Sequence, residues 1–172
     1  ALQEAQKFAV ERGGPIPEVT VTGHSLGGTL AQITAHHFDL RGETFNAYGA
    51  ASLGYRIPEG GDRVLNHVMA ADVVSAASPH YGRVRIYAAP GEIAQLRLCG
   101  YQNAWLADAL TVDHPLLASV NTSHMMHNFL NVDGDNRADV SNLRDASALA
   151  RAEGNAGMID GYRSDVAALR AA

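Results

Sequence analysis

The chain has 172 residues, of which 47% are hydrophobic and 18% charged, a composition that fits one globular domain with its own core. Its 13 basic and 18 acidic residues give a formal charge of -5, and the basic residues are scattered singly, which argues against nucleic acid as a partner. The single cysteine, Cys99, excludes an internal disulfide. No apolar run reaches the roughly eighteen residues needed to span a bilayer.

The first residues, ALQEAQKFAVERGG, have neither the basic lead nor the apolar centre of a Sec-type signal peptide, and they contain no methionine. We expect either a processed chain or a domain of a longer polypeptide. The destination of the protein stays unknown at this stage, because a domain of a secreted bacterial effector would have the same features.

The hydrophobic spacing of the first residues predicts an amphipathic helix that stops at Gly13-Gly14. The β-branched run Val19–Thr22 then predicts a short buried strand. A second helical pattern extends over Leu26–Phe38 and is closed by Arg41-Gly42. The front of the chain therefore reads as helix, strand, sharp turn and helix.

Three further apolar runs between Pro and Gly turns are predicted strands: Phe45–Ala51, Val64–Ala71 and Val84–Ala89. Strands that alternate with helices predict an α/β fold, with a mostly parallel sheet flanked by helices. Residues 90–123 are predicted to form a long, largely helical insertion. From Val140 onward the chain is Ala-rich and helix-prone, with breaks predicted at three glycines: Gly154, Gly157 and Gly161.

The segment VTVTGHSLGG, residues 19–28, sets a serine among glycines where a strand passes into a helix. A serine hydroxyl becomes a useful nucleophile when a base takes its proton and nearby donors stabilise the oxyanion. On a very tight turn the Ser25 side chain projects above the sheet, and the positions two residues away, Gly23 and Gly27, have to lack bulk. Gly28 permits close packing of the helix. The backbone N–H of Leu26 is then aimed at the developing negative charge.

A glycine-rich phosphate-binding loop is the alternative, but the chain has neither G-x-x-x-x-G-K-[ST] nor G-x-G-x-x-G at this point. The stretch VTVTGHSLGGTLAQITA resembles the nucleophile segment of the α/β-hydrolase superfamily, in particular of the class 3 lipases, which carry GHSLGG before an Ala-rich helix. The resemblance implies an α/β-hydrolase-like fold. It also implies that an acid and a base follow the nucleophile in the order Ser, Asp, His.

The acid is expected at the carboxyl end of a later strand. Asp72 directly follows the predicted strand over residues 64–71, and VLNHVMAADVVSAASPHYG is similar to the class 3 segment that delivers the catalytic Asp. The alternative interpretation is that Asp72 only caps a turn. Three other aspartates are weaker candidates: Asp62, Asp108 and Asp113.

Eight histidines compete for the role of the base. The segment SHMMHNF, residues 123–129, resembles the late motif of the family, in which the catalytic His is followed by an apolar pair and, five positions on, by an aromatic residue. This match makes His124 the base and gives Phe129 the aromatic position. His127 remains the alternative, because a slip of one helical turn would exchange the two histidines.

Three residues are assigned to the substrate side of the site: His24, Tyr55 and Trp105. His24 adjoins the nucleophile, although packing within the elbow is its other interpretation. Tyr55 follows the end of a predicted strand, and Trp105 lies in the 90–123 insertion. Both are candidates for the acyl wall or a mobile cover, and ordinary core packing is the alternative.

We expect neither a metal nor a cofactor. His124 and His127 lie three residues apart, but no neighbouring carboxylate completes a zinc ligand set. The stretch NVDGDNRADV crowds oxygen donors as a calcium loop does, with Asp133, Asp135 and Asp139 as the candidate ligands. It lacks the Gly of the sixth position and the Glu of the twelfth, so an exposed turn with Asx caps explains it better than calcium does.

The resemblance covers residues 1 to about 132 but omits the front of the family's sheet. The eighteen residues before Val19 are mostly one predicted helix and cannot supply the earlier strand and loop that normally bear the second oxyanion donor. We expect the chain to be part of a longer hydrolase; completion by a partner chain and weaker oxyanion stabilisation are the alternatives. An incomplete sheet should also leave an exposed edge and an uncovered apolar face.

The sequence thus predicts a class 3 lipase-like catalytic region over residues 1–139 and a C-terminal Ala-rich helical segment over residues 140–172. The expected activity is hydrolysis of lipid carboxylic esters, as by a lipase or phospholipase, through Ser25, His124 and Asp72 and an acyl-enzyme. Transient contact with a membrane surface would accompany it. The alternatives are an esterase or thioesterase for non-lipid acyl compounds, and a catalytically silent lipid-binding or interaction fragment of a larger protein.

Overall fold

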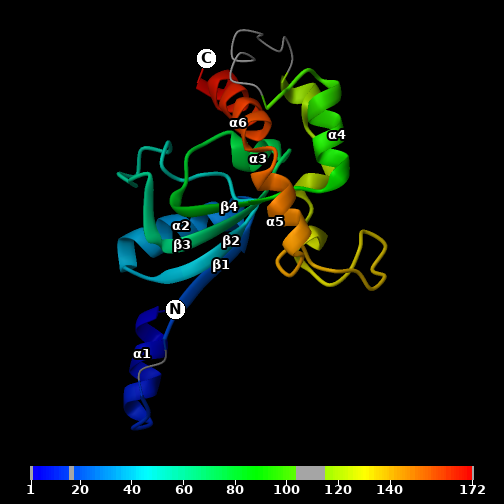
Figure 1. The fold of residues 1–172 in the computed structure, drawn as a ribbon. Helices are drawn as coiled ribbons and strands as arrows, with labels where there is room; N and C mark the ends of the chain where they lie inside the picture. The colour runs from blue at the N-terminus through cyan, green and yellow to red at the C-terminus, as the bar shows by residue number, and fades with distance from the viewer. Residues whose placement is uncertain (1, 16–17, 104–114, 172) are drawn as a thin grey trace.

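The structure is a computed structural model that describes residues 2–15, 18–103 and 115–171 (Figure 1). Its centre is a sheet of four strands in the order β1-β2-β3-β4, and every neighbouring pair is parallel. The strands are β1 (Thr20–His24), β2 (Arg41–Phe45), β3 (Gly60–Met69) and β4 (Tyr81–Tyr87). Because the strands are parallel, their carboxyl ends meet at one edge of the sheet, where a site can form. The prediction of an α/β-hydrolase-like parallel sheet flanked by helices is confirmed.

The connections between the strands place the predicted site residues at this carboxyl edge. Helix α2 (Leu26–Phe38) follows β1 after a single residue, Ser25. A loop over residues 46–59 joins β2 to β3, and the short helix α3 (Val73–Ala76) follows β3. Ser25 and Asp72 therefore leave the sheet on the same side, from strands that are separated only by β2.

The two faces of the sheet have different chemistry. Val21 and Val64 pack with Ala35 of α2 in a buried cluster on one face. Side chains alternate between faces along a strand, so residues paired across the sheet lie in rows. On the face away from α2, one row crosses all four strands and is mostly polar: Thr22, Glu43, Leu65 and Arg83. The prediction of an uncovered apolar face is therefore wrong, because the part of this face that no helix covers in the described residues is polar and charged.

Three later helices build a second core beyond the carboxyl ends of β3 and β4. They are α4 (Pro90–Leu98), α5 (Ala146–Glu153) and α6 (Ala156–Ala171). Side chains from all three helices join Ala70, Ala71 and Ala76 in one buried cluster, and the ring of Tyr162 on α6 is fully buried there. The C-terminal helices thus cover the end of the sheet that carries the predicted acid (Figure 1).

In the described residues between α4 and α5, that is 99–103 and 115–145, lie three short 3-10 turns: η2 (Pro115–Ala118), η3 (Asn121–His124) and η4 (Met126–Phe129). Phe129 packs with Met69, Tyr87 and Ala148 in a buried cluster. This cluster covers the sheet near the carboxyl ends of β3 and β4, on the face away from α2. The described parts of the 90–123 segment therefore contain one regular helix, α4, and short turns, in place of the long helical insertion that the sequence predicts.

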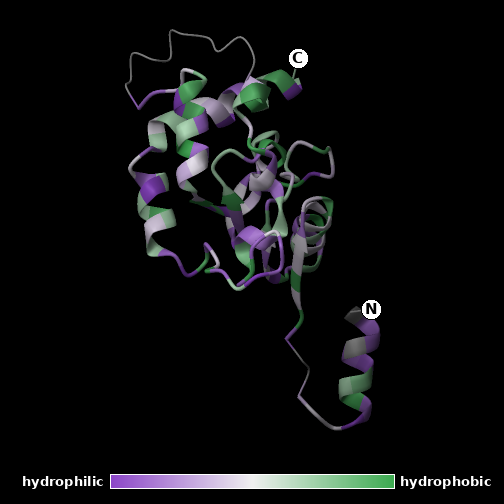
Figure 2. Cartoon of the chain, turned by 90° about the vertical axis from the view of Figure 1, so that its right-hand side faces the viewer, coloured by the Kyte–Doolittle hydropathy of each residue, from purple (hydrophilic) through white to green (hydrophobic). Residues whose placement is uncertain are grey.

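Helix α1 (Leu2–Glu11) stands apart from the sheet in both views (Figures 1 and 2). Phe8 and Val10 on this helix are 55% and 65% exposed. No strand precedes β1 within residues 2–15 and 18–103, so β1 is one edge of the sheet. The exposed edge that the sequence predicts is thus present.

Two predicted boundaries are wrong. Residues 45–51 are not a strand: β2 ends at Phe45, and Asn46 turns the chain out of the sheet with a φ of 44°. Arg41 and Gly42 open β2, whereas α2 already ends at Phe38.

In the C-terminal segment, the breaks predicted at Gly157 and Gly161 are wrong, because both glycines lie inside α6. An added Cβ at Gly157 would come within 3.3 Å of the backbone of Asn103, so this glycine serves packing.

Across the described residues, none of the helices has the length and apolar character that crossing a membrane requires.

Candidate active site

The turn between β1 and α2 holds Ser25 in a backbone conformation that side chains rarely adopt, with φ 54° and ψ -124°. A Cβ on Gly23 would lie 2.3 Å from the backbone of Gly27, and a Cβ on Gly28 would lie 2.5 Å from the Cβ of Ala47. Both positions therefore require glycine. Gly27 itself has no atom within 4 Å of the place of a Cβ in the described structure, so its expected lack of bulk serves no contact there.

Ser25, His124 and Asp72 form a continuous chain of hydrogen bonds. The Nε2 atom of His124 lies 3.0 Å from Oγ of Ser25, and its Nδ1 atom lies 3.0 Å from Oδ1 of Asp72. A carboxylate only accepts, so Nδ1–H donates to Asp72 and the lone pair of Nε2 faces the serine hydroxyl. Three side chains that are far apart in the sequence thus meet at the carboxyl edge of the sheet in the arrangement that a Ser-His-Asp triad requires.

Asp72 is fully buried and has two roles in the structure. Its carboxylate caps α3 by accepting the backbone N–H groups of Val74 and Ser75, at 3.2 and 3.0 Å, and it also binds His124. The turn-capping interpretation and the acid interpretation therefore both describe this side chain. The cap fixes the carboxylate in the orientation from which it meets the imidazole.

The hydrogen bond that Nδ1–H of His124 donates to Asp72 raises the pKa of His124 above the ordinary value of 6.5, against the opposing effect of partial burial. The carboxylate stabilises the imidazolium form, which is the form that a general base reaches when it accepts a proton. The electrostatics of the pair therefore favour proton transfer to Nε2.

His24 does not point into open space beside the nucleophile. Its Nε2–H donates to the backbone carbonyl of His124 at 2.6 Å, and the two rings lie 4.8 Å apart. This contact agrees with the packing interpretation, since His24 holds the turn that carries His124. A role for His24 in binding substrate stays a prediction.

Two of the other predicted site residues, His127 and Tyr55, are not joined to this hydrogen-bonded chain. The ring of His127 faces Gly134, and it is His124 that meets Ser25. Tyr55 is 58% exposed on the loop between β2 and β3. Trp105 lies outside the described residues. Ala50 and Ile57, on the same loop as Tyr55, are buried in the core.

Leu26 is the first residue of α2, so its backbone N–H is one of the amides that have no acceptor within the helix. Its side chain is 69% exposed. This N–H stands directly after Ser25, where the positive end of the helix dipole favours an anion. The second donor expected from an earlier strand has no counterpart in residues 2–15 and 18–24, which hold only α1 and β1.

A buried polar network behind the site was missed by the sequence analysis. Gln32 on α2 accepts the N–H groups of Ala50 and Tyr81 through Oε1, and its Nε2 contacts Nδ1 of His80. The Nε2–H of His80 donates to the carbonyl of Ser75 at 2.9 Å, and Arg163 on α6 donates to the same carbonyl at 2.8 Å. The network ties three helices together, and its contacts from Gln32 to His80 and Tyr81 and from Arg163 to Ser75 span 48, 49 and 88 positions, separations that no local pattern reveals.

We expect His80 to make the fold sensitive to acid. Burial lowers the pKa of His80 from 6.5 to about 4, so the unfolded chain binds its proton first as the pH falls. The stability that neutral His80 supports is complete above pH 6.5 and is lost as the pH falls from 6.5 through about 4. Chemical denaturation at pH 7 and pH 4 should show that His80→Gln reduces this loss by about 3 kcal/mol.

The matched control is His37→Gln, at an exposed position of α2. It should lose as much stability between the two pH values as the unsubstituted chain does. Equal acid sensitivity of the His80→Gln variant and this control would contradict the expected role of His80.

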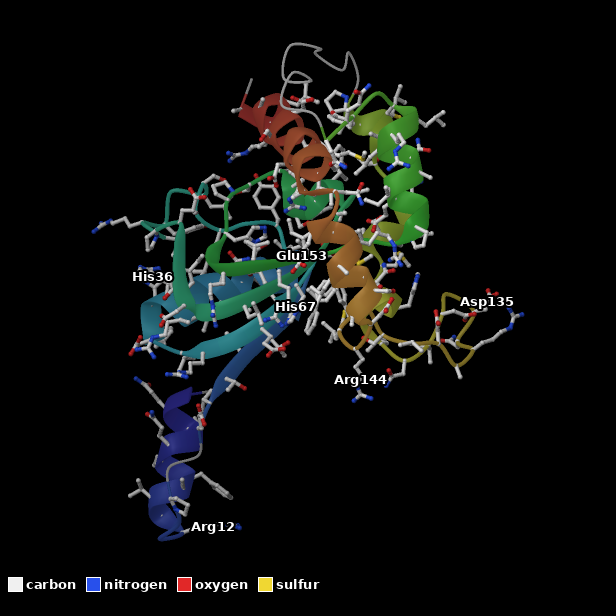
Figure 3. All side chains as sticks on the ribbon, in the orientation of Figure 1. Arg12, His36, His67, Asp135, Arg144 and Glu153 are labelled. Carbon is white, nitrogen blue, oxygen red and sulfur yellow. The ribbon has the colours of Figure 1, made fainter. Side chains whose placement is uncertain are left out.

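The candidate calcium stretch forms a self-contained turn. Oδ1 of Asp133 accepts the N–H groups of Asp135 and Arg137, and Asp135 pairs with the Arg137 guanidinium at 2.8 Å. Oδ1 of Asp139 accepts the N–H of Val140. Figure 3 shows Asp135 at the outer part of this loop, far from His67 over the sheet. The carboxylates are thus engaged in Asx turns and an ion pair.

The parallel sheet and the serine on a strained turn between β1 and α2 define the class of protein: an α/β-hydrolase-like chain. Residues 3–85 match the family model described as lipase (class 3). This range contains Ser25 and Asp72, and over it the chain is similar to the class 3 lipases, a family of lipid-ester hydrolases. No curated protein and no solved structure matched the chain.

Proposed function

We propose that the chain is a serine hydrolase of lipid carboxylic esters, of the lipase or phospholipase type, that works through Ser25, His124 and Asp72. The observation that carries the proposal is the hydrogen-bonded chain from Oγ of Ser25 through the imidazole of His124 to Oδ1 of Asp72, with both distances at 3.0 Å. The family match over residues 3–85 supports the choice of an ester substrate.

The reaction has two halves. In the first, Nε2 of His124 takes the Ser25 hydroxyl proton while Oγ bonds to the carbonyl carbon; the tetrahedral intermediate then expels the alcohol, which receives the proton from Nε2. In the second, His124 takes a proton from water, the hydroxide attacks the acyl-enzyme, and the carboxylic acid leaves as Ser25 regains its proton. Asp72 keeps the imidazole tautomer and stabilises the imidazolium in both halves.

The oxyanion of each tetrahedral intermediate needs backbone donors. The N–H of Leu26 is the donor that this chain supplies next to Ser25. We assign the second donor to a segment that would lie beside the free edge of β1, either from the same polypeptide or from a partner chain. Removal of one such donor costs about 10²- to 10³-fold in kcat, so a site with the Leu26 N–H as its one donor should work slowly.

The direct test is labelling with a fluorophosphonate probe, which reacts with activated serines. The expected result is one probe on the peptide that contains Ser25, detected by mass spectrometry, with no label after heat denaturation. Ser164→Ala, at an exposed position of α6, is the control and should label as the unsubstituted chain does. Folded chain that stays unlabelled at high probe concentration would overturn the proposal.

Comparison of substrates separates the lipid hydrolase from its alternatives. Hydrolysis rates of p-nitrophenyl esters with short and long acyl chains, in solution and in micelles, should favour the long chains in micelles. Preference for a short soluble ester or an acyl thioester would favour a non-lipid esterase or thioesterase. Absence of both labelling and turnover would favour a catalytically silent fragment.

A further inference from the structure

The base of the proposed triad, His124, lies on a short element that has few hydrogen bonds of its own. His124 is the last residue of η3, a four-residue 3-10 turn, and Met125 after it returns to extended backbone. A single turn of this kind does not fix a side chain by its own hydrogen bonds. Since catalysis requires the imidazole to hold its position within a fraction of an ångström, other groups have to hold the turn in place.

Three buried or half-buried side chains form hydrogen bonds to Ser123 and His124, the last two residues of this turn. Glu92 accepts the Ser123 hydroxyl at 2.6 Å, and Nδ2 of Asn46 donates to the Ser123 carbonyl at 2.6 Å. Nε2–H of His24 donates to the carbonyl of His124, also at 2.6 Å. These side chains come from α4 and from the ends of β2 and β1. The turn is therefore positioned by the sheet and by α4.

Glu92 differs from the other two because it also binds the residue before the acid. Its Oε1 atom accepts both the Ser123 hydroxyl and the backbone N–H of Ala71, at 2.6 and 2.9 Å. Ala71 directly precedes Asp72, and Ser123 directly precedes His124. Its Oε2 atom accepts the N–H of Ala89 at the start of α4, at 2.7 Å. One carboxylate oxygen thus joins the residue before the acid to the residue before the base.

We propose that Glu92 is a positioning residue that fixes the separation between Asp72 and His124 and thereby holds Nε2 of His124 at Ser25. The catalytic part of this inference rests on the proposed hydrolase function, whereas the geometric part does not. Glu92 touches neither the nucleophile nor the acid and base directly, so it acts only through Ala71 and Ser123.

The surroundings of Glu92 explain why a carboxylate serves here. The side chain is only 2% exposed, and burial raises its pKa, opposed by its three hydrogen bonds. Asp72 also raises the pKa of Glu92, while Arg163 and Tyr162 on α6 face the same cluster. All three bonds are donated to Glu92, so a glutamine would turn an NH₂ group toward at least one of these donors.

The test compares serine-to-alanine substitutions at two buried positions. Ser123→Ala removes only the bond from Glu92 to the base turn and leaves the bonds to Ala71 and Ala89. Ser78→Ala is the matched control, since Ser78 is 3% exposed against 2% for Ser123 and donates to the Gly49 carbonyl at the same 2.6 Å. Glu92→Gln is the third variant and disturbs both ends of the link.

Two readouts separate positioning from general stability. The first is the titration of the His124 imidazole by NMR, which needs no turnover. Because Asp72 raises the pKa of His124, loosening of the link should move the midpoint to lower pH in Ser123→Ala and Glu92→Gln but not in Ser78→Ala. The second is the rate of ester hydrolysis per labelled serine, where the first two variants should lose about 10- to 100-fold in kcat with little change in KM.

The outcomes are distinct. If Ser123→Ala and Ser78→Ala behave alike in both readouts, Glu92 only stabilises the fold and the proposal is wrong. If the unsubstituted chain neither hydrolyses esters nor reacts with fluorophosphonate, the proposed function fails, and the His124 titration still decides whether Glu92 sets the separation of acid and base.

Discussion

Ser25→Ala is expected to abolish ester hydrolysis, with a loss in kcat on the order of 10⁴- to 10⁶-fold, because it removes the hydroxyl oxygen that Nε2 of His124 contacts. Ser25→Gly should be equally inactive, yet it should be more stable. Glycine adopts a φ of 54° and ψ of -124° without steric cost, whereas any residue with a Cβ is strained there. Chemical denaturation should show Ser25→Gly to be about 1 kcal/mol more stable than Ser25→Ala.

The pair of variants isolates the strain, since both lack the hydroxyl and differ only in the Cβ. Equal free energies of unfolding would show that the turn stores no strain at this residue. Retention of more than about a hundredth of the activity in either variant would show that another group is the nucleophile.

Asp72→Asn has the second largest expected effect, a loss of about 10⁴-fold in kcat. Asparagine can still cap α3 through its side-chain oxygen, so the fold should persist. It offers the imidazole a neutral partner, and the bond from Asp72 is the main cause of the raised pKa of His124. The acidic limb of the pH profile, where activity falls as His124 takes a proton, should therefore move to lower pH.

The matched control is Asp145→Asn. Asp145 caps α5 by accepting the N–H of Ser147, in the same way as Asp72 caps α3, but it makes no contact with His124. Kinetics over a pH series should show the profile of Asp145→Asn unchanged. A profile of Asp72→Asn that keeps both its height and its midpoint would contradict the assigned role of Asp72.

The elbow was predictable because its cause is local. A serine that needs an unusual φ, with Gly23 and Gly28 facing backbone and Ala47, leaves a dense signature within ten residues. The strand of the acid was predictable for a similar reason, because the second half of β3 is mostly apolar and Asp72 follows it within three residues. The order Ser, Asp, His came from the resemblance to class 3 lipases, and the family match itself ends before His124.

The boundaries of β2 could not be predicted from apolar runs, because the strand itself contains polar residues. Arg41 and Glu43 belong to the uncovered face of the sheet, and the apolar residues after Phe45 fold into a loop once Asn46 takes a positive φ. A strand with one hydrated face alternates in polarity, and five residues are too few to show that period clearly.

The polar contacts of the site could not be predicted from the sequence. Glu92 contacts Ala71 and Ser123, which lie 21 and 31 positions away, and the bond from His24 to the His124 carbonyl spans 100 positions. Nothing in the neighbourhood of Glu92 marks it as different from any acidic residue in the first turn of a helix. Only the folded arrangement shows that its carboxylate is buried and fully used.

The row of Thr22, Glu43, Leu65 and Arg83 across the open half of the sheet affects how copies of the chain meet. Stacking of two such sheets would strip water from guanidinium and carboxylate groups without offering each a fitted counterpart. Face-to-face aggregation is therefore opposed even though none of the helices in the described residues shields this row. The polar row on this face of the sheet can therefore stay exposed to solvent without causing precipitation by face-to-face stacking.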